Sequence, residues 1–355
     1  MARWLVVCSL LALGFPATTM AGSRVTIAPL VAAFYYPWYG TPATDGAWVH
    51  WNQNNHNPPD DIASAYYPLM GPYSSADPTV LATQMSEIQE VGINEIIVSW
   101  WGRGSFEDKH LPAVIAAAKL DGIAVAVHIE PYAGRSPTSV VSDIWYLRTL
   151  GITSFYVFHP DDYTAAQWAP ALDAVHAFQA SGVPATVPAQ VFVQTPLAGY
   201  AAAAHFDGVY TYDTLTYRGN ELSRICNEAH AVGLLCGPSV GPGYNAVRAT
   251  GDPRIKPRRD GATYDSMWVA ALAARPDLIT ITSFNEWHEG TQIEPAAPPG
   301  VHDGVAYLGY EGAWGLRGVP AETAYLARTA YWTRIYEGES KFLTTVKKST
   351  AKKGH

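Results

Sequence analysis

Cysteine and charge are both scarce in this sequence. Only three Cys occur among 355 residues, so a small fold held together by many disulfides is excluded. Charged residues make up 15% of the chain and hydrophobic residues 48%, which is typical of a globular protein with a large core. The formal charge of -8 argues against nucleic acid as a partner and gives no reason to expect binding to an anionic membrane.

Long apolar runs are also lacking, and the one apolar stretch, at the start, has the pattern of a secretory signal. Arg3 supplies a short positive region, residues 5–15 an apolar one, and residues 19–21 a cleavage site of small residues. We therefore expect a signal peptide at 1–22 that is removed near Ala21. The mature protein is expected to be secreted, extracellular or periplasmic, and to be a soluble monomer with no membrane partner.

The mature chain keeps two cysteines, because Cys8 lies in the predicted signal. Cys226 and Cys236 form an even pair, which in an oxidising compartment is consistent with a disulfide. Their spacing of ten fits equally well two buried thiols on a helix and the next strand. The sequence leaves both alternatives open.

Strand-like and helix-like runs alternate eight times along the chain. The strands are apolar on both faces, as in a parallel sheet covered by helices, and are predicted at 31–38, 94–101, 123–130, 154–159, 189–194, 206–212, 233–238 and 278–284. Eight such units close most naturally into a (β/α)8 TIM barrel with long loops forming a substrate cleft. An open doubly wound sheet is the alternative, although no GxGxxG follows the first strand.

The alternation covers nearly the whole mature chain, and its last helix is predicted at 321–337. Residues 23–340 are therefore expected to form a single catalytic domain. The last fifteen residues, 341–355, carry five Lys and few apolar groups, so we expect a basic, flexible tail.

The ends of the predicted strands carry side chains that suit a sugar ligand. Active sites of TIM barrels lie at the C-terminal ends of the strands. The chain has 12 Trp and 21 Tyr, whose flat faces suit the C–H faces of sugar rings. The candidates at these ends are Tyr36, Trp100, Trp101, His128, Glu130, Tyr210, Tyr212, Asn285 and Glu286.

The segment 279–295 supplies the strongest catalytic candidates. It begins as a buried strand and ends in a polar cluster that contains Glu286, Trp287 and Glu289. Glycoside hydrolysis needs a proton donor for the leaving oxygen and a second group that assists at the anomeric centre. The two acids are three residues apart, so a helical turn would point both the same way. A neighbouring indole and a second carboxylate could raise a carboxyl pKa toward neutrality.

Glu130 ends another strand and shares a strand face with His128, so it could face the same cleft. An orienting role is the alternative for Glu130, and a hydrogen-bonded structural role is the alternative for each histidine. A metal-dependent hydrolase is a further alternative, with His128, Glu130, His288 and another acid binding Zn2+ or Mn2+. No compact HxH or HExxH motif supports that site.

Two long loops are predicted to shape the cleft. The first, at 40–76, is rich in aromatics that argue against disorder, and we interpret it as a wall of the cleft. The second runs from 241 to 263. Its arginines could clamp sugar hydroxyls or only decorate the surface, and both readings stay open for Arg248, Arg254, Arg258 and Arg259.

Several motifs in this order resemble those of glycoside hydrolase family 99, the endo-α-1,2-mannosidases. They are FYYPWYGTP at 34–42, WVHWN at 48–52, SWWGRG at 99–104, HIEPYAGR at 128–135 and NEWHEGTQIEPA at 285–296. The acid in HIEPY resembles bacterial members. The long loops 41–76 and 245–262 do not match in detail, which leaves the natural glycan open.

The resemblance implies a retaining, endo-acting hydrolase of α-mannosides that needs no metal or cofactor. Glu286 would deprotonate the 2-hydroxyl of the substrate to give a 1,2-anhydro sugar, and Glu289 would be the general acid and then the base for water. Glucosyl- or mannosyl-α-1,3-mannose capped glycans and α-mannan are the expected substrates. A carbohydrate-binding barrel without catalysis is the alternative.

The resemblance also implies a set of residues that bind the sugar around the cleavage point. Glu130 would lie near the cleaved bond. The others are His128, Tyr36, His50, Trp100, Trp101, Tyr210, Tyr212, Asn285, Trp287 and Tyr244.

Overall fold

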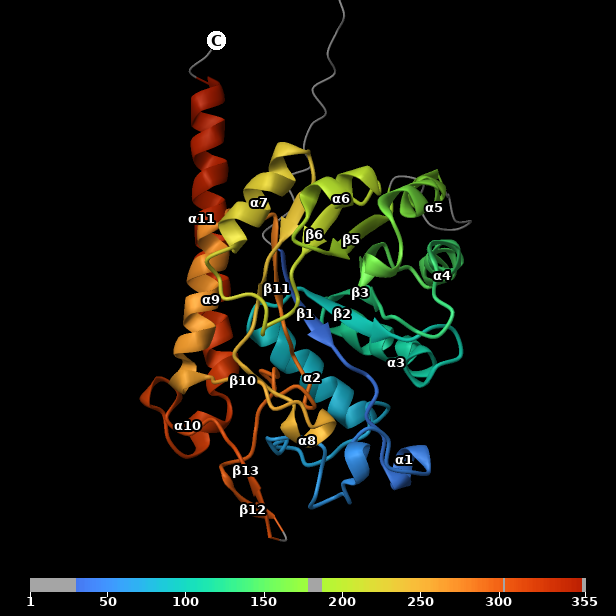
Figure 1. Ribbon diagram of the computed structural model, residues 1–355. Helices are drawn as coiled ribbons and strands as arrows, with labels where there is room; N and C mark the ends of the chain where they lie inside the picture. Colours follow the sequence, from blue (N-terminus) through green and yellow to red (C-terminus); the bar gives the residue numbers. More distant parts are fainter. Residues whose placement is uncertain (1–29, 178–186, 303, 353–355) are drawn as a thin grey trace, which may run out of the picture.

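The structure is a computed structural model that describes residues 30–177, 187–302 and 304–352 (Figure 1). The predicted signal peptide at 1–22 lies outside the described residues. Among the helices that are described, none combines the length and the apolar character needed to cross a membrane.

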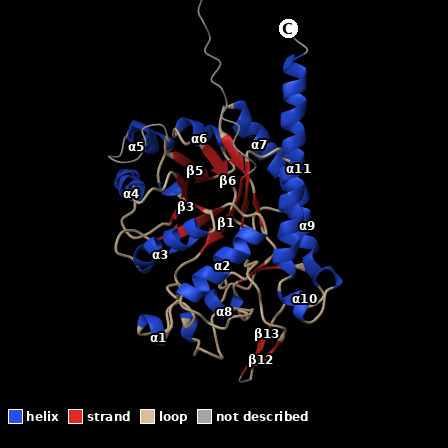
Figure 2. Cartoon of the chain, turned by 180° about the vertical axis from the view of Figure 1, so that it is seen from behind, coloured by secondary structure: helices blue, strands red, loops and turns tan. Residues whose placement is uncertain are grey.

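A parallel sheet lies at the centre of the molecule, with helices around it (Figure 2). The order of its strands is β7-β6-β5-β4-β3-β2-β1-β11-β8. The first seven in sequence are β1 Leu30–Tyr35, β2 Glu95–Trp100, β3 Ala124–Ile129, β4 Ser154–Val157, β5 Gln190–Gln194, β6 Gly208–Tyr210 and β7 Leu235–Gly237. The remaining two are β8 Ser239–Val240 and β11 Leu278–Ile281. All eight predicted strands are confirmed, with β7 and β8 together forming the seventh.

Pro238 divides the seventh strand, and this division closes the sheet. The part before it, β7, pairs with β6, whereas the part after it, β8, pairs with β11 through Thr280↔Ser239 and Ile281↔Val240. One short segment thus bonds to the strands on both of its sides. The result is the predicted (β/α)8 barrel rather than an open sheet.

A helix follows each of the eight strands. These helices are α2 Pro78–Glu90, α3 Phe106–Leu120, α4 Pro137–Thr149, α5 Ala165–Ala177, α6 Ala198–Ala203, α7 Leu222–Ala231, α9 Ala262–Ala273 and α11 Ala324–Lys352. The sequence explains where several begin. Asp77 accepts a hydrogen bond from the Thr79 N–H, and Ser136 forms a capping box with Ser139, each before a Pro at the first helical position.

The last helix differs from the prediction. It was expected to end at 337 and to be followed by a flexible tail at 341–355, but α11 continues through Lys352. No proline interrupts the sequence after Pro320, so nothing there blocks continuation, and the good helix formers Lys, Glu, Leu and Ala alternate with weaker ones.

The two cysteines of the mature chain form a disulfide. Cys226 on α7 is bonded to Cys236 on β7, with their Cα atoms 5.2 Å apart. The bond ties a helix of the outer layer to the strand that follows it. Of the two alternatives that the sequence left open, the structure selects the disulfide.

The long loops gather at the C-terminal ends of the strands, at the lower end of the molecule in Figure 1. They contain the short elements α1 Pro42–Asp45, β9 Tyr244–Asn245, α8 Val247–Thr250, β10 Ile255–Lys256, β12 Gly300–His302, β13 Val305–Tyr307 and α10 Val319–Glu322. The fold therefore builds one elaborated face, and the acids of the segment 279–295 lie on it.

Candidate active site

The exit of β11 is bonded to the exit of β1. The side chain of Asn285 accepts a hydrogen bond from the Tyr36 N–H at 2.7 Å and donates one to the Tyr36 carbonyl at 3.1 Å. The Phe284 N–H also donates to the Phe34 carbonyl at 2.8 Å. These bonds fix the direction in which the chain leaves the barrel before the two acids.

Residues 286–291, here called the acidic turn, fold back on themselves. The Gly290 N–H donates to the Trp287 carbonyl at 3.2 Å, and the Thr291 N–H donates to the Glu286 carbonyl at 3.3 Å. The His288 N–H donates to the carboxyl of Glu286 at 3.0 Å. Glu286 is almost fully buried, whereas Glu289 is partly exposed.

The environment raises the pKa of both acids. Burial, followed by the charge of Glu289, raises the pKa of Glu286 well above its usual range. Burial, followed by the charges of Asp213 and Glu130, raises the pKa of Glu289 to about 7. Two carboxyls that repel each other in a buried site lose their protons in separate steps. The pair therefore passes through a form with one proton, which acid–base catalysis requires.

Glu130 faces the same site from the end of β3. Its carboxyl accepts a hydrogen bond from the Ser99 hydroxyl at 2.8 Å and is 2.9 Å from Nδ1 of His128, whose Nε2 is 2.9 Å from the Tyr210 hydroxyl. The charge of Glu130 contributes to the raised pKa of both Glu286 and Glu289. The three acids named from the sequence thus share one electrostatic site.

Two tyrosines lie close enough to the acids to feel their charge. The hydroxyls of Tyr36 and Tyr212 are hydrogen-bonded to each other, and the Tyr212 ring stacks on His128 with centroids 5.4 Å apart. Burial first, and then the charges of the surrounding acids, raises the pKa of both phenols well above its usual range. Both hydroxyls therefore stay protonated and can donate hydrogen bonds.

A pair of neutral histidines lies on the side of the first loop. His50 stacks on Trp38 with ring centroids 4.5 Å apart, and its carbonyl is 2.9 Å from Nε2 of His288. Burial lowers the pKa of His50 to about 4 and that of His288 to about 3. Both rings are therefore uncharged near neutral pH.

Four of the predicted sugar-binding residues have no exposed surface and do not line the cleft. They are Trp100, Tyr210, Asn285 and Trp287, each 0% exposed. Trp100 donates to Asp108 of α3 at 2.8 Å, and Trp287 donates to Glu294 at 2.7 Å. Their polar groups are satisfied by protein atoms in this structure, and their role as sugar contacts stays a prediction.

The other predicted residues keep access or lie close to it. Trp101 is 37% exposed, and His50, Tyr244 and Glu289 are partly exposed. A small part of each remaining side chain reaches the surface: Tyr36, Tyr212, His128 and Glu130. These residues come from five strand ends and two loops, so the barrel brings most of the predicted set together.

Sequence reasoning missed a buried network behind Trp287. Glu294 accepts hydrogen bonds from Gln84 at 2.6 Å, from the Tyr73 hydroxyl at 2.8 Å and from the indole of Trp287. Burial raises the pKa of Glu294 to about 7. The sequence does point to Glu294, because it belongs to the same polar cluster as Glu286 and Glu289. Nothing in the sequence points to Gln84, which lies in the helix α2.

Two arginines of the second loop neither clamp the cleft nor decorate the surface. Arg248 is bonded to Asp61, donates to the Ile62 carbonyl at 3.1 Å and lies over the ring of Tyr307. Arg258 is buried. The first loop, the second loop and the β12–β13 hairpin are thereby joined into one wall beside the cleft. Arg254 is exposed and pairs with Asp252.

The metal site considered as an alternative does not form. Both ring nitrogens of His128 have hydrogen-bond partners, and Nε2 of His288 faces the His50 carbonyl. Across residues 30–177, 187–302 and 304–352, no group of three or more His, Cys, Asp or Glu side chains is placed to hold a metal ion.

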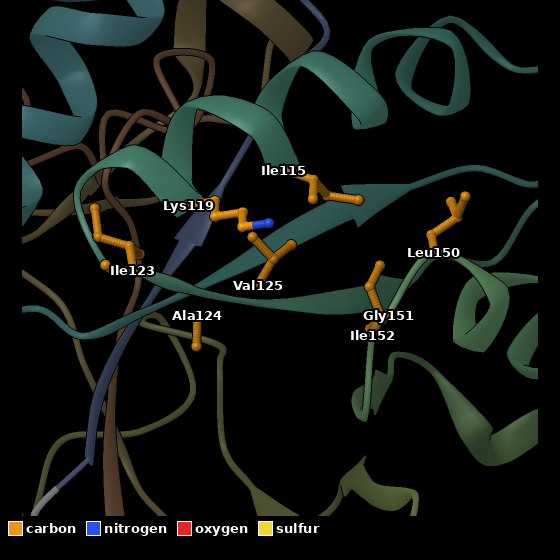
Figure 3. A pocket seen from close by; sticks show the side chains of 9 residues that line it. Ile115, Lys119, Ile123, Ala124, Val125, Leu150, Gly151 and Ile152 are labelled. Atoms are coloured by element: carbon orange, nitrogen blue, oxygen red, sulfur yellow. The ribbon is translucent and has the colours of Figure 1, made fainter. Parts of the chain in front are cut away.

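A hollow at the opposite face of the barrel is unrelated to this site. It has a volume of about 320 Å3 and is open to solvent (Figure 3). It is lined by Ile115, Lys119, Gly122, Ile123, Ala124, Val125, Leu150, Gly151 and Ile152, none of them acidic. These residues precede β3 and β4 or begin β3, away from the strand ends that carry Glu130 and Glu286.

Residues 26–338 match the family model described as Glycosyl hydrolase family 99. The chain belongs to this family. It is therefore a glycosidase, and a glycan is its substrate.

Individual relatives of this family 99 chain agree with that assignment. A glycoprotein endo-alpha-1,2-mannosidase-like protein of Danio rerio is 35% identical over 320 residues, which cover 75% of this chain and 70% of that protein. A glycoprotein endo-alpha-1,2-mannosidase of Rattus norvegicus is 31% identical over 358 residues, covering 87% and 75%. The solved GH99 endo-alpha-mannosidase of Bacteroides thetaiotaomicron is 30% identical, with a TM-score of 0.76 over 87% of this chain and 97% of that one.

Proposed function

We propose that this family 99 chain is an endo-acting α-mannosidase that cleaves α-1,2-mannosidic linkages inside a glycan. The proposal rests mainly on the two buried acids of one turn, Glu286 and Glu289, which lie at the C-terminal face of the barrel with Glu130 near them. Relatives named as endo-mannosidases, over most of both chains, support the choice of mannose.

In the proposed mechanism, the ionised Glu286 takes the proton from the 2-hydroxyl of the mannose at the cleaved bond. The 2-oxygen then attacks the anomeric carbon, and Glu289 gives its proton to the leaving oxygen. Water, deprotonated by Glu289, opens the 1,2-anhydro sugar at the anomeric carbon while Glu286 returns its proton to the 2-oxygen. Two displacements retain the anomeric configuration.

The raised pKa values support a pair that holds one proton near neutral pH, and the assignment of base and acid within the pair rests on the resemblance to family 99. A carboxylate with a raised pKa is a stronger base, which suits Glu286 for a hydroxyl proton. A carboxyl with a pKa of about 7 still holds its proton near neutral pH, which suits Glu289 as the acid. Glu130 and the Tyr36–Tyr212 pair would bind the hydroxyls of the same sugar.

We further propose that the substrate is a glucosyl- or mannosyl-α-1,3-mannose capped glycan or an α-mannan, and that the mature protein is exported and monomeric. The signal-like residues 1–22 support export. The disulfide between Cys226 and Cys236 also supports it, because such bonds persist in oxidising compartments.

The experiment compares aryl glycosides of α-mannose and of the disaccharide α-mannosyl-1,3-mannose. An endo-acting enzyme that uses a second subsite releases the phenol from the disaccharide and leaves the monosaccharide glycoside intact. Release from the monosaccharide alone would indicate an exo-acting enzyme. Binding of the disaccharide without release over a long incubation would favour a carbohydrate-binding barrel.

A further inference from the structure

We propose that Arg258 is a positioning residue that holds the acidic turn where Glu289 can deliver its proton. The inference rests on the proposed function, because it concerns the role given there to Glu289. Arg258 itself is nine-tenths buried, and it donates hydrogen bonds to the backbone at the end of the turn and just after it rather than to the cleft.

The bonds of Arg258 end next to Glu289. One guanidinium nitrogen, Nη2, donates to the Gly290 carbonyl at 3.0 Å and to the Gln292 carbonyl at 2.7 Å. The same loop reaches the turn a second time, because the Asn245 N–H donates to the Glu289 carbonyl at 2.7 Å. The peptide groups on the C-terminal side of Glu289 are therefore held from outside the turn.

Arg258 is in turn fixed by three aromatic rings. Its guanidinium carbon lies 4.8 Å from the ring centroid of Tyr66, 4.8 Å from that of Tyr310 and 4.4 Å from that of Tyr325. These rings belong to the first loop, to the segment after β13 and to α11. Contacts between a cation and ring faces strengthen when they are removed from water. The arginine thus contacts the turn and three other parts of the molecule at the same time.

Gly290 shows how closely the second loop approaches the turn. It has a φ of 61°, and a Cβ at this position would lie 3.1 Å from the Asn245 carbonyl oxygen. The bonds inside the turn set its shape, but they do not set its place over the cleft. On its N-terminal side the turn is held by Tyr39 and His50, through the Trp287 N–H and Nε2 of His288. On the side that follows Glu289 its place depends on the contacts with Arg258 and Asn245, and proton transfer tolerates only small displacements of the acid.

The test uses two substrates that share one α-mannosyl-1,3-mannosyl group. One has a mannose leaving group, which needs a proton from Glu289, and the other has a dinitrophenolate leaving group, which needs none. For Arg258→Met we expect kcat/KM to fall on the order of 100-fold with the mannose leaving group and by less than about threefold with dinitrophenolate. Arg258→Lys should restore part of the loss, because an ammonium group can donate to both carbonyls.

Arg328→Met is the matched control. Arg328 also packs on three rings, those of Trp314, Tyr331 and Trp332, but its hydrogen bonds go to Asp265 and not to the acidic turn. The Arg328→Met variant should unfold more easily than the wild type, and any loss of kcat/KM should be the same for the two substrates. If Arg258→Met does not fold, Arg258→Lys is used in its place. Its loss of kcat/KM should be smaller but confined in the same way to the mannose leaving group.

An equal loss on both substrates in Arg258→Met and Arg258→Lys, as in the control, would overturn the positioning role. If the wild type cleaves neither substrate, the proposed function fails first, and the inference falls with it. A selective loss in the Arg258 variants, absent from the control, supports both.

Discussion

At the scale of single residues, the proposed chemistry depends on the pKa of the Glu289 carboxyl. Its carboxyl lies beside Glu286, and the charges of Asp213 and Glu130 add to the effect of burial. Burial, and then the neighbouring acids, thus keep a proton on a group that would lose it in water. The same neighbours make the protonation state of the site sensitive to pH.

The first prediction concerns the pH dependence of this group. The pKa of Glu289 is raised to about 7, and the acid must be protonated to act, so kcat/KM for a sugar leaving group should fall by about tenfold per pH unit above this value. Glu289→Gln should lower kcat for that substrate on the order of 100- to 10,000-fold. The measurement is a pH profile of kcat/KM.

A substrate with a dinitrophenolate leaving group is the control, because its departure needs no proton. Its profile should lack the decline near pH 7, and Glu289→Gln should spare its cleavage in the first step. A decline that sits at the same pH for both leaving groups would show that another group titrates there.

Residue types at the strand ends could be predicted, but their exposure could not. Trp100 and Trp101 are neighbours in the sequence at the end of one strand, yet Trp100 is fully buried and Trp101 is 37% exposed. Alternation along a strand decides which side chain turns outward, and the phase of that alternation depends on how the strand twists into the barrel. Tyr210 and Tyr212 show the limit too, since both were named and only Tyr212 keeps any access.

At the scale of elements, all eight strands could be predicted because buried strands and amphipathic helices leave different periods in the sequence. The split of the seventh strand at Pro238 could not, since it arises from pairing with β6 on one side and β11 on the other. The packing of the second loop could not be predicted from the sequence either. Arg248 and Arg258 find partners that lie 187 and 32 residues away, respectively.

The disulfide between Cys226 and Cys236 is expected to raise the free energy of unfolding. It closes a short loop between α7 and β7, and in the chain-entropy model such a bond stabilises by about 3 kcal/mol. Replacing both Cys226 and Cys236 by Ala should lower the free energy of unfolding by roughly this amount while leaving the kinetics of cleavage unchanged. Urea unfolding followed by tryptophan fluorescence measures the difference.

Reduced wild type provides the comparison for the double variant. The two should unfold at about the same urea concentration, below that of the oxidised wild type. Equal stability of all three forms would mean that the bond makes no contribution to the folded state.

At the scale of the whole molecule, buried acids other than Glu286 and Glu289 make stability depend on pH. Burial raises the pKa of Glu95 to about 7, that of Glu294 to about 7 and that of Glu87 to about 8. In the unfolded chain these groups titrate near pH 4.3. Between these values the folded state binds more protons than the unfolded state, so the free energy of unfolding should fall as pH rises from about 5 to 8.

Glu294→Gln tests this expectation, because an amide does not titrate. The variant should show a flatter loss of stability between pH 5 and pH 8 than the wild type, by an amount on the order of 3 kcal/mol. Glu228→Gln is the control, since Glu228 is an exposed residue paired with Arg224. Identical slopes for wild type and Glu294→Gln would contradict a raised pKa at Glu294.

The assignment as an endo-α-mannosidase with Glu286 and Glu289 as its acting groups is tested most directly by the mass of the first product. The protein is incubated with an α-1,2-linked mannan oligosaccharide labelled at its reducing end, and the early products are measured by mass spectrometry. We predict release of a disaccharide or longer fragment by the wild type and no release by Glu286→Gln over the same time. Release of single mannose residues, or equal release by wild type and Glu286→Gln, would contradict it.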